Sequence, residues 1–365
     1  MVSRELLRNG RYIFFKRGMT PIYLLLGVTY RCNARCRTCF NYEKLNKNDE
    51  ELTVEEHSRI AATIGRITWV LFTGGEPLLS KKLPQIASIY YSTNDCRRFT
   101  LPTNGLLPEH TLEITQRILR DCPKAYLTVS LALDDLYERG DQIRGVRGAF
   151  ELLLNTYELL ADIKAGEKRL SLNLNTVLMN CNINYISEIM DFVLKEMPAV
   201  DFHGFEILRG TTADNSLAPP SHDEYEALLA RLNVYWEKFP FYRTPLSRLL
   251  KAVKIETRAM ELEVMRGTLI IPCHAGTISG LIDARGDVYF CEELSEVVGN
   301  LRDVGYDFRQ VWFSQKARQL RDFIERGRCS CTHSCFLASS IMFEPRFYPR
   351  LIKRAFSLKK VLIFD

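Results

Sequence analysis

The sequence predicts an α/β fold, in which helices cover a parallel sheet and a small cysteine-containing domain follows. Six short apolar segments alternate with amphipathic stretches through the first two-thirds of the 365 residues, and this alternation is typical of parallel strands joined by helical crossovers. Five of the eleven cysteines then fall within residues 273–335. Apolar residues make up 46% of the chain and charged residues 25%, which is the composition of a soluble globular protein.

The expected strands are short apolar runs bounded by turn-forming residues. They cover residues 22–29, 69–73, 99–103, 125–133, 170–178 and 201–208. The amphipathic stretches between them predict helices over residues 53–65, 81–92, 109–120, 149–165 and 186–197. The first helix opens with a capping box, because Glu56 follows Thr53 by three residues, so each side chain can bond the backbone N–H of the other.

Three cysteines follow the first expected strand. Cys32, Cys36 and Cys39 have the spacing C-x3-C-x2-C, which gathers three thiolates into one short loop. Such soft ligands suit an iron–sulfur cluster, and a four-iron cluster held by only three of them would have one iron open to a substrate or cofactor. A zinc loop completed by a distant ligand and a chance spacing are the alternatives at this point.

A glycine pair ends the second expected strand. Gly74 and Gly75 follow the run W-V-L-F-T, and Glu76-Pro77 comes next. Two glycines at the end of a strand let a ligand approach the backbone closely. The Glu76 carboxylate would be available there to receive an ammonium group.

Together, the cysteine loop and the G-G-E-P segment resemble the radical S-adenosylmethionine (SAM) superfamily. The resemblance implies a partial (β/α)6, TIM-like barrel over roughly residues 22–210. It also implies a [4Fe–4S] cluster on the three cysteines, whose open iron chelates the amino and carboxyl groups of SAM. Gly74, Gly75 and Glu76 would contact the SAM amino group. The sequence departs from the family at Thr38, where an aromatic residue is usual, and Phe40 would then cover the cluster.

Active sites of such barrels assemble at the carboxyl ends of the strands. Asn104 ends the third expected strand and is a candidate cofactor-binding residue. The resemblance implies that Ser130 on the fourth strand and Arg144 in a D-x-x-R-G segment bind the ribose and carboxylate of SAM, and the planar fork of arginine matches a carboxylate. Asp134 is a weaker candidate, because the family's aspartate comes sooner after the serine. An ordinary loop cap is the alternative for each.

The fifth expected strand carries two asparagines on one side, Asn173 and Asn175, and we expect one of them to face the pocket. Cys96, Cys122 and Cys181 have no partner at ligand spacing, so we expect them to be small buried residues.

A second cysteine set lies near the C-terminus. Cys273 and Cys291 flank a predicted β-hairpin that turns near Arg285-Gly286. A predicted helix over residues 308–327 is followed by the run C-S-C-T-H-S-C, which contributes Cys329, Cys331 and Cys335.

This second set resembles the SPASM/twitch extension of radical SAM maturases. A full SPASM domain needs seven cysteines for two clusters, whereas five are present here, so the resemblance implies a second [4Fe–4S] cluster of the twitch kind. Its ligands would be Cys273, Cys291 and Cys335, with either Cys331 or Cys329 as the fourth. The alternative is a structural zinc site on the same thiolates, with His333 or His274 as a further ligand.

The predicted domains are a basic amphipathic segment (residues 1–20), the barrel (21–240), a linker helix with the cluster domain (241–342) and a basic amphipathic tail (343–365). Residues 1–17 carry five cations against one carboxylate, and residues 343–365 carry six against two. Both ends also hold large apolar side chains, a combination that suits an anionic membrane face. The alternative is that both ends pack on the body of the protein with their charges solvated.

No apolar stretch reaches the length of a membrane span, and the N-terminus lacks a signal-peptide core. Eleven cysteines without a secretion signal indicate metal ligation in a reducing cytosol. We therefore expect a cytoplasmic protein, peripheral on the inner face of the membrane if its termini dock there. We expect no nucleic-acid partner, and the resemblance implies an external one-electron reductant such as flavodoxin or ferredoxin.

The resemblance implies an enzyme that reductively cleaves SAM to a 5′-deoxyadenosyl radical, which abstracts a hydrogen atom from its substrate. That substrate would be a small molecule, a lipid-linked precursor or a peptide. Only 21 residues precede the first strand, too few for the peptide-binding domain that is often fused to peptide maturases. This short segment makes a peptide the less favoured of the three substrate classes. The alternative is a non-catalytic iron–sulfur or zinc binding module, against which the presence of both motifs argues.

Overall fold

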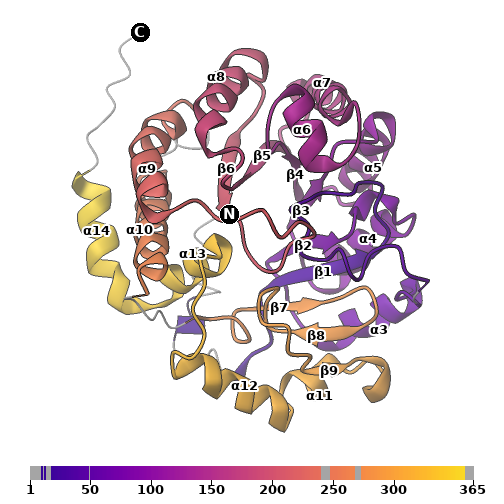
Figure 1. Ribbon diagram of the computed structural model, residues 1–365. Coiled ribbons are helices and arrows are strands. Elements are labelled where there is room, and N and C mark those ends of the chain that lie inside the picture. Colours follow the sequence, from indigo (N-terminus) through magenta and orange to yellow (C-terminus); the bar gives the residue numbers. More distant parts are fainter. Residues whose placement is uncertain are drawn as a thin grey trace. The chain divides into compact units, whose positions relative to one another are not determined.

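The computed structural model describes Gly10 and residues 12–13, 18–48, 50–239, 247–267 and 273–357. The chain forms two compact units (Figure 1). The barrel unit contains Met19–Pro220 and Ala275–Asp322, and the helical unit contains Met1–Gly18, Ser221–His274 and Phe323–Asp365. Most of the basic segment expected over residues 1–20 lies outside the described residues, as do residues 358–365 of the tail.

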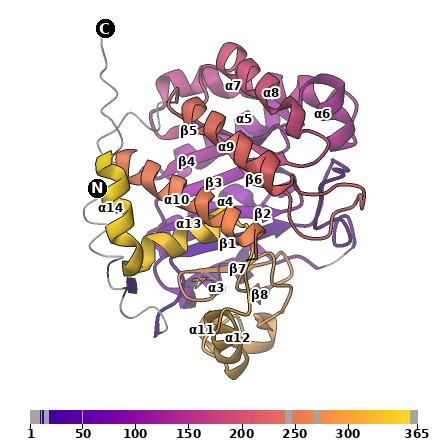
Figure 2. The same cartoon turned by 60° about the vertical axis from the view of Figure 1, so that its left-hand side comes forward.

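One nine-stranded sheet runs through the barrel unit, in the order β6-β5-β4-β3-β2-β1-β7-β8-β9. Its first six strands are parallel and lie side by side in chain order (Figures 1 and 2). They are β1 Tyr23–Thr29, β2 Trp69–Gly74, β3 Arg98–Thr103, β4 Tyr126–Ala132, β5 Leu170–Leu178 and β6 Phe202–Ile207. All six strands predicted from the sequence are thereby confirmed.

Helices connect these strands along the outer side of the sheet (Figure 1). They are α3 Val54–Ile64, α4 Leu83–Thr93, α5 Pro108–Asp121, α6 Tyr137–Arg144, α7 Ala149–Gly166 and α8 Ile186–Glu196. The five predicted helices are among them, and the capping box at the start of α3 is formed as expected. The short helix α6 is an additional element between β4 and α7.

The two faces of the sheet differ because side chains alternate along each strand. Leu24, Phe72 and Phe99 are fully buried, on the face that the helices cover. Trp69 and Thr100 lie on the other face, are partly exposed, and are joined by a 2.9 Å hydrogen bond from the indole Nε1 to the threonine Oγ1. The parallel strands and outer helices form the expected partial (β/α)6 barrel, with a half-solvated inner face.

The predicted C-terminal hairpin continues this sheet. Strand β7 (Ser279–Ile282) pairs in parallel with β1, and β8 (Asp287–Tyr289) and β9 (Gly299–Asn300) follow antiparallel. The turn falls where it was predicted, with Gly286 at a φ of 92°, a conformation that favours glycine. Residues 279–300 are therefore continuous with the barrel sheet, although the sequence analysis assigned them to the domain that starts at residue 241. The functional boundaries between domains stay a prediction.

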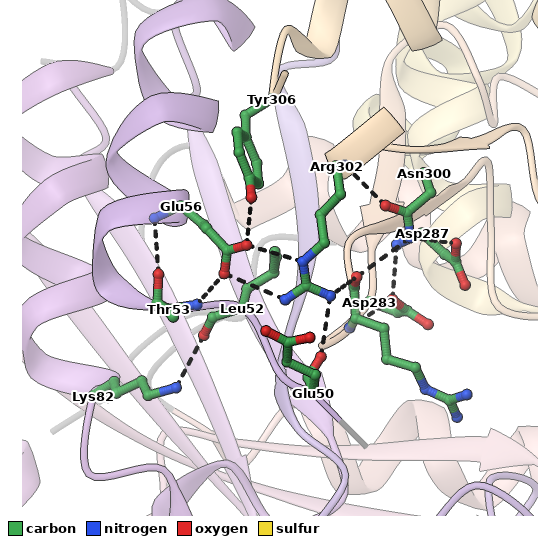
Figure 3. Close-up of polar contacts among 11 residues, drawn as sticks. Glu50, Leu52, Thr53, Glu56, Lys82, Asp283, Asp287, Asn300, Arg302 and Tyr306 are labelled. Carbon is green, nitrogen blue, oxygen red and sulfur yellow. Dashed lines mark hydrogen bonds and ion pairs between the residues drawn. The ribbon is translucent and has the colours of Figure 1, made fainter. Parts of the chain in front are cut away.

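A polar cluster attaches this extension to α3 (Figure 3). The Arg302 Nε donates to Glu56 Oε1 at 2.9 Å, and the Tyr306 hydroxyl donates to the same oxygen at 2.6 Å. The other Glu56 oxygen accepts the Thr53 N–H at 2.7 Å as part of the capping box. Arg302 also donates to the Glu50 carbonyl at 3.2 Å. The Glu56 carboxylate thus caps the start of α3 and also binds the segment after β9.

The single helix predicted over residues 308–327 is wrong. The structure has α11 Phe308–Trp312 and α12 Gln315–Glu325 instead. Ser314 separates them because its side chain accepts the Ala317 N–H at 3.1 Å, which is the hydrogen bond of a helix N-cap. The Trp312 carbonyl is also bonded by Arg321, at 2.6 Å.

Four helices of the helical unit are α9 His222–Trp236, α10 Ser247–Met265, α13 Ser334–Phe343 and α14 Tyr348–Ser357, and Figure 2 shows α10, α13 and α14 together. Ile341 of α13 and Leu351 of α14 share a buried cluster with Ala252 and Val253 of α10. The Arg354 Nε on α14 donates to the buried Glu256 at 2.6 Å. Much of the described tail therefore packs within its unit. Among the described residues, no helix is long and apolar enough to cross a membrane.

Candidate functional site

The cysteine loop begins just after β1. Cys32, Cys36 and Cys39 are all partly exposed. The Asn46 side chain closes the loop, accepting the Cys32 N–H at 2.9 Å and donating to the Cys32 carbonyl at 3.1 Å. The Cys39 N–H donates to the Cys36 carbonyl at 3.1 Å. The loop is therefore held by contacts to its backbone, which leave all three sulfur atoms available as ligands.

The glycine pair after β2 lies directly against this loop. The Gly75 N–H donates to the Thr29 carbonyl at 2.8 Å, and the Glu76 N–H donates to the Arg31 carbonyl at 2.9 Å. A Cβ at Gly74 would lie 2.1 Å from the Thr29 oxygen, and one at Gly75 would lie 2.3 Å from the Arg31 oxygen. Only glycine fits at these two positions, so the two sequence motifs form one site.

The Glu76 carboxylate is buried and joins the ends of β2 and β3. It accepts the Asn104 N–H at 2.8 Å and the Leu78 N–H at 3.2 Å. Asn104 in turn donates from its side chain to Asn33 in the cysteine loop at 2.8 Å. Burial raises the pKa of Glu76 to about 7, although the two N–H donors favour the anion. These contacts fix the loop, and direct binding of SAM by Glu76 or Asn104 stays a prediction.

Arg144 also lies beside the cysteine loop. Its Nη1 is 3.6 Å from Cys36 Sγ, and its Nη2 is 2.9 Å from Asp134 Oδ2. The structure thus joins both candidate residues of this region in one ion pair. A contact between Arg144 and the carboxylate of SAM stays a prediction.

The remaining candidates lie on the inner face of the sheet. Ser130 on β4 stands opposite Asn173 on β5, and both are partly exposed, as is Asn175 two residues further along β5. The strand register places Ser130 next to Asn173. Asn173 and Asn175 both face inward, so the structure does not decide which of the two faces the pocket.

Sequence reasoning missed the segment after β6, which also closes on the cysteine loop. The Arg37 Nε lies 2.7 Å from Asp214 Oδ2. The Ala213 N–H donates to the Cys39 carbonyl, and the Asp214 N–H donates to the Arg37 carbonyl, both at 3.1 Å. Asp214 lies 177 residues from Arg37, so no local sequence pattern could predict this contact.

Sequence reasoning also missed two glutamates that follow Cys291. Glu293 accepts from the Arg209 Nε at 2.9 Å, and Arg209 also pairs with Glu206 of β6 at 3.3 Å. Glu292 accepts from the Thr73 hydroxyl at 3.4 Å, at the end of β2. The run C-E-E was visible in the sequence, but only the fold reveals its partners.

The three cysteines fit the cluster that the resemblance implies. Burial raises the pKa of the Cys39 thiol to about 11 and also raises the pKa of Cys32, so a bound cation is needed to keep these groups as thiolates at neutral pH.

The second cysteine set is divided between the two units. Cys291, in the barrel unit, is buried and accepts the Leu294 N–H at 3.2 Å. Cys335, in the helical unit, is exposed and is the second residue of α13. The His274 N–H donates to Ser340 of α13 at 3.1 Å, which attaches the neighbouring Cys273 to the same helix. Cys329 and Cys331 also lie in the helical unit and are partly exposed.

The three remaining cysteines were expected to be buried. Cys96 and Cys122 are buried, whereas Cys181 is exposed, so the expectation for Cys181 was wrong.

Comparison with known proteins identifies two domains in the chain. Residues 26–193 match the model of the radical SAM superfamily, and residues 273–336 match the SPASM model, described as an iron-sulfur cluster-binding domain. The chain is 28% identical over 193 residues to the Fe-coproporphyrin III synthase of Methanosarcina barkeri, a match that covers 52% of this chain and 45% of that protein. It is 40% identical over 116 residues to the GTP 3′,8-cyclase of Acidothermus cellulolyticus, covering 30% of this chain and 31% of the relative.

A solved structure shares the fold. Streptococcus suis SuiB bound to S-adenosylmethionine superposes with a TM-score of 0.57 and 18% identity, covering 88% of this chain and 71% of that one. A likeness at this identity shows the fold alone. The first family implies a catalytic [4Fe–4S] cluster and SAM, and the second implies an auxiliary iron–sulfur cluster. The chain belongs to the radical SAM superfamily and carries a SPASM domain.

Proposed function

We propose that the chain is an enzyme that reductively cleaves SAM at a cluster on Cys32, Cys36 and Cys39. When bound, the cluster and SAM supply one electron and a 5′-deoxyadenosyl radical that takes a hydrogen atom from the substrate. The observation that carries this proposal is the contact between the two motifs, in which Gly75 and Glu76 donate to the Thr29 and Arg31 carbonyls at 2.8 and 2.9 Å. This contact supports SAM binding directly beside the cysteine loop, whose three thiolates would hold the cluster.

Six residues would bind SAM around this point. The glycine pair gives the ligand access to the backbone, and Glu76 with Asn104 fixes that backbone through the 2.8 Å hydrogen bond between them. Ser130 on the inner face would reach the ribose. Arg144 would contribute a cation matched to the SAM carboxylate. The full set is Gly74, Gly75, Glu76, Asn104, Ser130 and Arg144.

An auxiliary [4Fe–4S] cluster would use Cys273, Cys291 and Cys335, with Cys329 or Cys331 as the fourth ligand. One feature supports a ligand role for this set, the 3.2 Å hydrogen bond from the Leu294 N–H to Cys291 Sγ. A donor aimed at the sulfur atom favours its negatively charged form. A zinc ion on the same thiolates is the other occupant to be tested.

The reaction needs an electron from outside the chain, because reductive cleavage of SAM consumes one. We propose a low-potential one-electron donor of the flavodoxin or ferredoxin type. The curated relatives described above are named for unlike products, a tetrapyrrole and a cyclised nucleotide, and the matches cover less than half of each. These two relatives therefore do not indicate which substrate this chain uses.

The function is tested by anaerobic preparation of the full chain, followed by iron and sulfide analysis and an assay for 5′-deoxyadenosine with SAM and a reductant. We expect about eight irons per chain for two four-iron clusters, together with 5′-deoxyadenosine. Bound iron without any 5′-deoxyadenosine would instead favour a non-catalytic cluster-binding module.

We also propose that the enzyme is cytoplasmic and docks peripherally on an anionic membrane face through α14. Ile352 is 54% exposed and Phe356 is 82% exposed, and they are four residues apart, hence on one side of the helix. Lys353 is exposed and neighbours Phe356, because the two are three residues apart. Arg350 keeps 69% of its side chain exposed, but it is two residues before Ile352 and so points away from this side. Such a surface is suited to the boundary between headgroups and acyl chains. A lipid-linked substrate would be presented there.

Apolar burial would dominate this docking. Burying an Ile or a Phe side chain fully contributes about 1.5–3 kcal/mol, whereas each cation near an anionic surface contributes about 1 kcal/mol. Glu256 already accepts from Arg354 at 2.6 Å and from Arg350 at 3.4 Å, which reduces the electrostatic share further.

Vesicle sedimentation tests the docking. We expect the full chain to pellet with vesicles containing anionic lipid more than with neutral ones, and the double variant Ile352→Glu/Phe356→Glu to stay in the supernatant. Val234→Glu is the matched control, because Val234 on α9 is 63% exposed and its substitution should leave binding unchanged. Equal recovery with both vesicle types, or binding by the double variant, would count against docking and favour a soluble substrate.

A further inference from the structure

The backbone of α6 is fixed against the cysteine loop on both sides of Cys36. The Arg35 N–H donates to the Arg144 carbonyl at 3.0 Å, and the Arg37 N–H donates to the Ile143 carbonyl at 2.9 Å. Gly145 then turns the chain away at a φ of 64°, and a Cβ there would lie 2.5 Å from the Arg35 carbonyl oxygen. The helix end therefore cannot move away from the loop without breaking these contacts.

This anchoring directs the Arg144 guanidinium at the sulfur atom. Nη1 lies 3.6 Å from Cys36 Sγ, within reach of a hydrogen bond to sulfur. Nη2 donates to the Ala132 carbonyl at 2.6 Å and lies 2.9 Å from Asp134 Oδ2. Burial alone would lower the pKa of Arg144, but Asp134 and Cys36 outweigh it and raise the pKa. The guanidinium is therefore a permanent cation.

Asp134 is equally fixed. It is 3% exposed, and its Oδ1 accepts the Val177 N–H at 2.9 Å. Sulfur, guanidinium and carboxylate thus form a chain from Cys36 through Arg144 to Asp134. A buried charge chain of this kind acts on the charge of whatever Cys36 ligates, because the local dielectric constant is low.

We propose that Arg144 and Asp134 set the reduction potential of the catalytic cluster through Cys36. The inference rests on the proposed function, since it requires the cluster. Uptake of one electron from the external reductant makes the cluster more negative, and a cationic donor on a ligating sulfur stabilises that state. The Asp134 carboxylate opposes the effect by neutralising the donor. Arg144 therefore raises the potential, and Asp134 limits the rise.

Two substitutions should shift the potential in opposite directions. Arg144→Met removes the cation and should lower the potential, so that the cluster is harder to reduce. Asp134→Asn leaves the cation unneutralised and should raise it. We expect each to change the reduced-to-oxidised ratio at fixed potential by about tenfold, which is 59 mV for one electron. Arg144→Lys keeps a cation and should stay nearer to the parent chain than Arg144→Met.

Arg139→Met is the matched control. Arg139 lies on the same helix and pairs with Asp135 at 2.9 Å and Glu188 at 2.8 Å, but no contact joins it to Cys36. Replacing Arg139 leaves the buried carboxylate of Asp135 without its cation. The control therefore disturbs α6 as Arg144→Met would, but away from Cys36. The control should leave the potential unchanged.

The measurement is a redox titration of the full, cluster-loaded chain followed by electron paramagnetic resonance, with the catalytic signal identified as the one that is missing when Cys32, Cys36 and Cys39 are replaced together with alanine. Opposite shifts support the inference. Shifts of the same sign, or no shift in Asp134→Asn, overturn it, and the latter variant suffices if Arg144→Met fails to hold its cluster. A parent chain that holds iron but has no SAM-responsive signal would instead overturn the proposed function.

Discussion

A Cβ at Gly75 would lie 2.3 Å from the Arg31 carbonyl oxygen, so these two residues fix the distance between the cysteine loop and the segment after β2. The carbonyl belongs to the backbone and a Cβ is bonded directly to the backbone, so neither can rotate away as the end of a long side chain could. The cysteine loop and the segment proposed to bind SAM therefore depend on each other for their geometry.

Gly75→Ala should damage both functions of the site. Relieving the contact requires the loop to shift, at a cost of about 1–3 kcal/mol, and the shift would displace Cys32, whose Cβ lies 3.2 Å from the added methyl. We expect less iron per chain and weaker SAM binding in equilibrium dialysis. Gly166→Ala is the control, because no heavy atom lies within 4 Å of a Cβ there. Unchanged iron and SAM affinity in Gly75→Ala would contradict the close contact.

Asn46 should be needed to hold the cluster. Its side chain makes two hydrogen bonds to the Cys32 backbone, at 2.9 and 3.1 Å, each with a net contribution of about 0.5–1.5 kcal/mol. Asn46 also has a φ of 56°, so Asn46→Gly removes the side chain without adding backbone strain. We expect this variant to lose iron to a chelator faster than the parent chain does. The exposed Asn48 provides the control Asn48→Gly, and equal rates in both variants would refute the role of Asn46.

Much of the fold follows from local sequence. Each parallel strand was visible as an apolar run, and the capping box at Thr53 and Glu56 is formed as predicted. The contacts that complete the fold and the site were not visible, because they join distant residues. Arg302 lies 246 residues from Glu56, and Asp214 lies 177 from Arg37. Ser314, a residue that favours helix N-caps, lies at the break between α11 and α12. The amphipathic pattern continues on both sides of it, so the sequence predicted one helix.

The contact between Glu56 and Arg302 should make stability depend on pH. Burial alone would raise the pKa of Glu56, but hydrogen bonds from Arg302 and Tyr306 outweigh it and lower the pKa from 4.5 to about 2. A folded-state pKa below the unfolded value gives stabilisation that is present above pH 4.5 and is lost as the pH falls toward 2.

Glu56→Gln removes this effect. At pH 7 the variant should lose about 1–2 kcal/mol of unfolding free energy, measured in urea, and the difference from the parent chain should shrink below pH 4.5. The exposed neighbour gives the control Glu55→Gln, for which we expect no difference at either pH. A gap for Glu56→Gln that stays constant from pH 7 to pH 3 would argue against the ion pair.

Cys291→Ser should remove the auxiliary cluster and spare the catalytic one. Loss of one thiolate should reduce the iron content from about eight to about four per chain, while cleavage of added SAM persists if the auxiliary cluster is not an obligatory electron carrier. The exposed Cys181 gives the control Cys181→Ser, which should keep all its iron. Zinc in place of the second four irons in the parent chain would favour the structural metal site instead.

The most direct test of the account replaces Cys32, Cys36 and Cys39 together with alanine and measures 5′-deoxyadenosine under anaerobic conditions with SAM and reductant. The account predicts that the parent chain forms 5′-deoxyadenosine, while the triple variant forms none and keeps about four irons on the second cysteine set. Formation of 5′-deoxyadenosine by the triple variant at the rate of the parent chain would contradict the assignment of the catalytic cluster to these three cysteines.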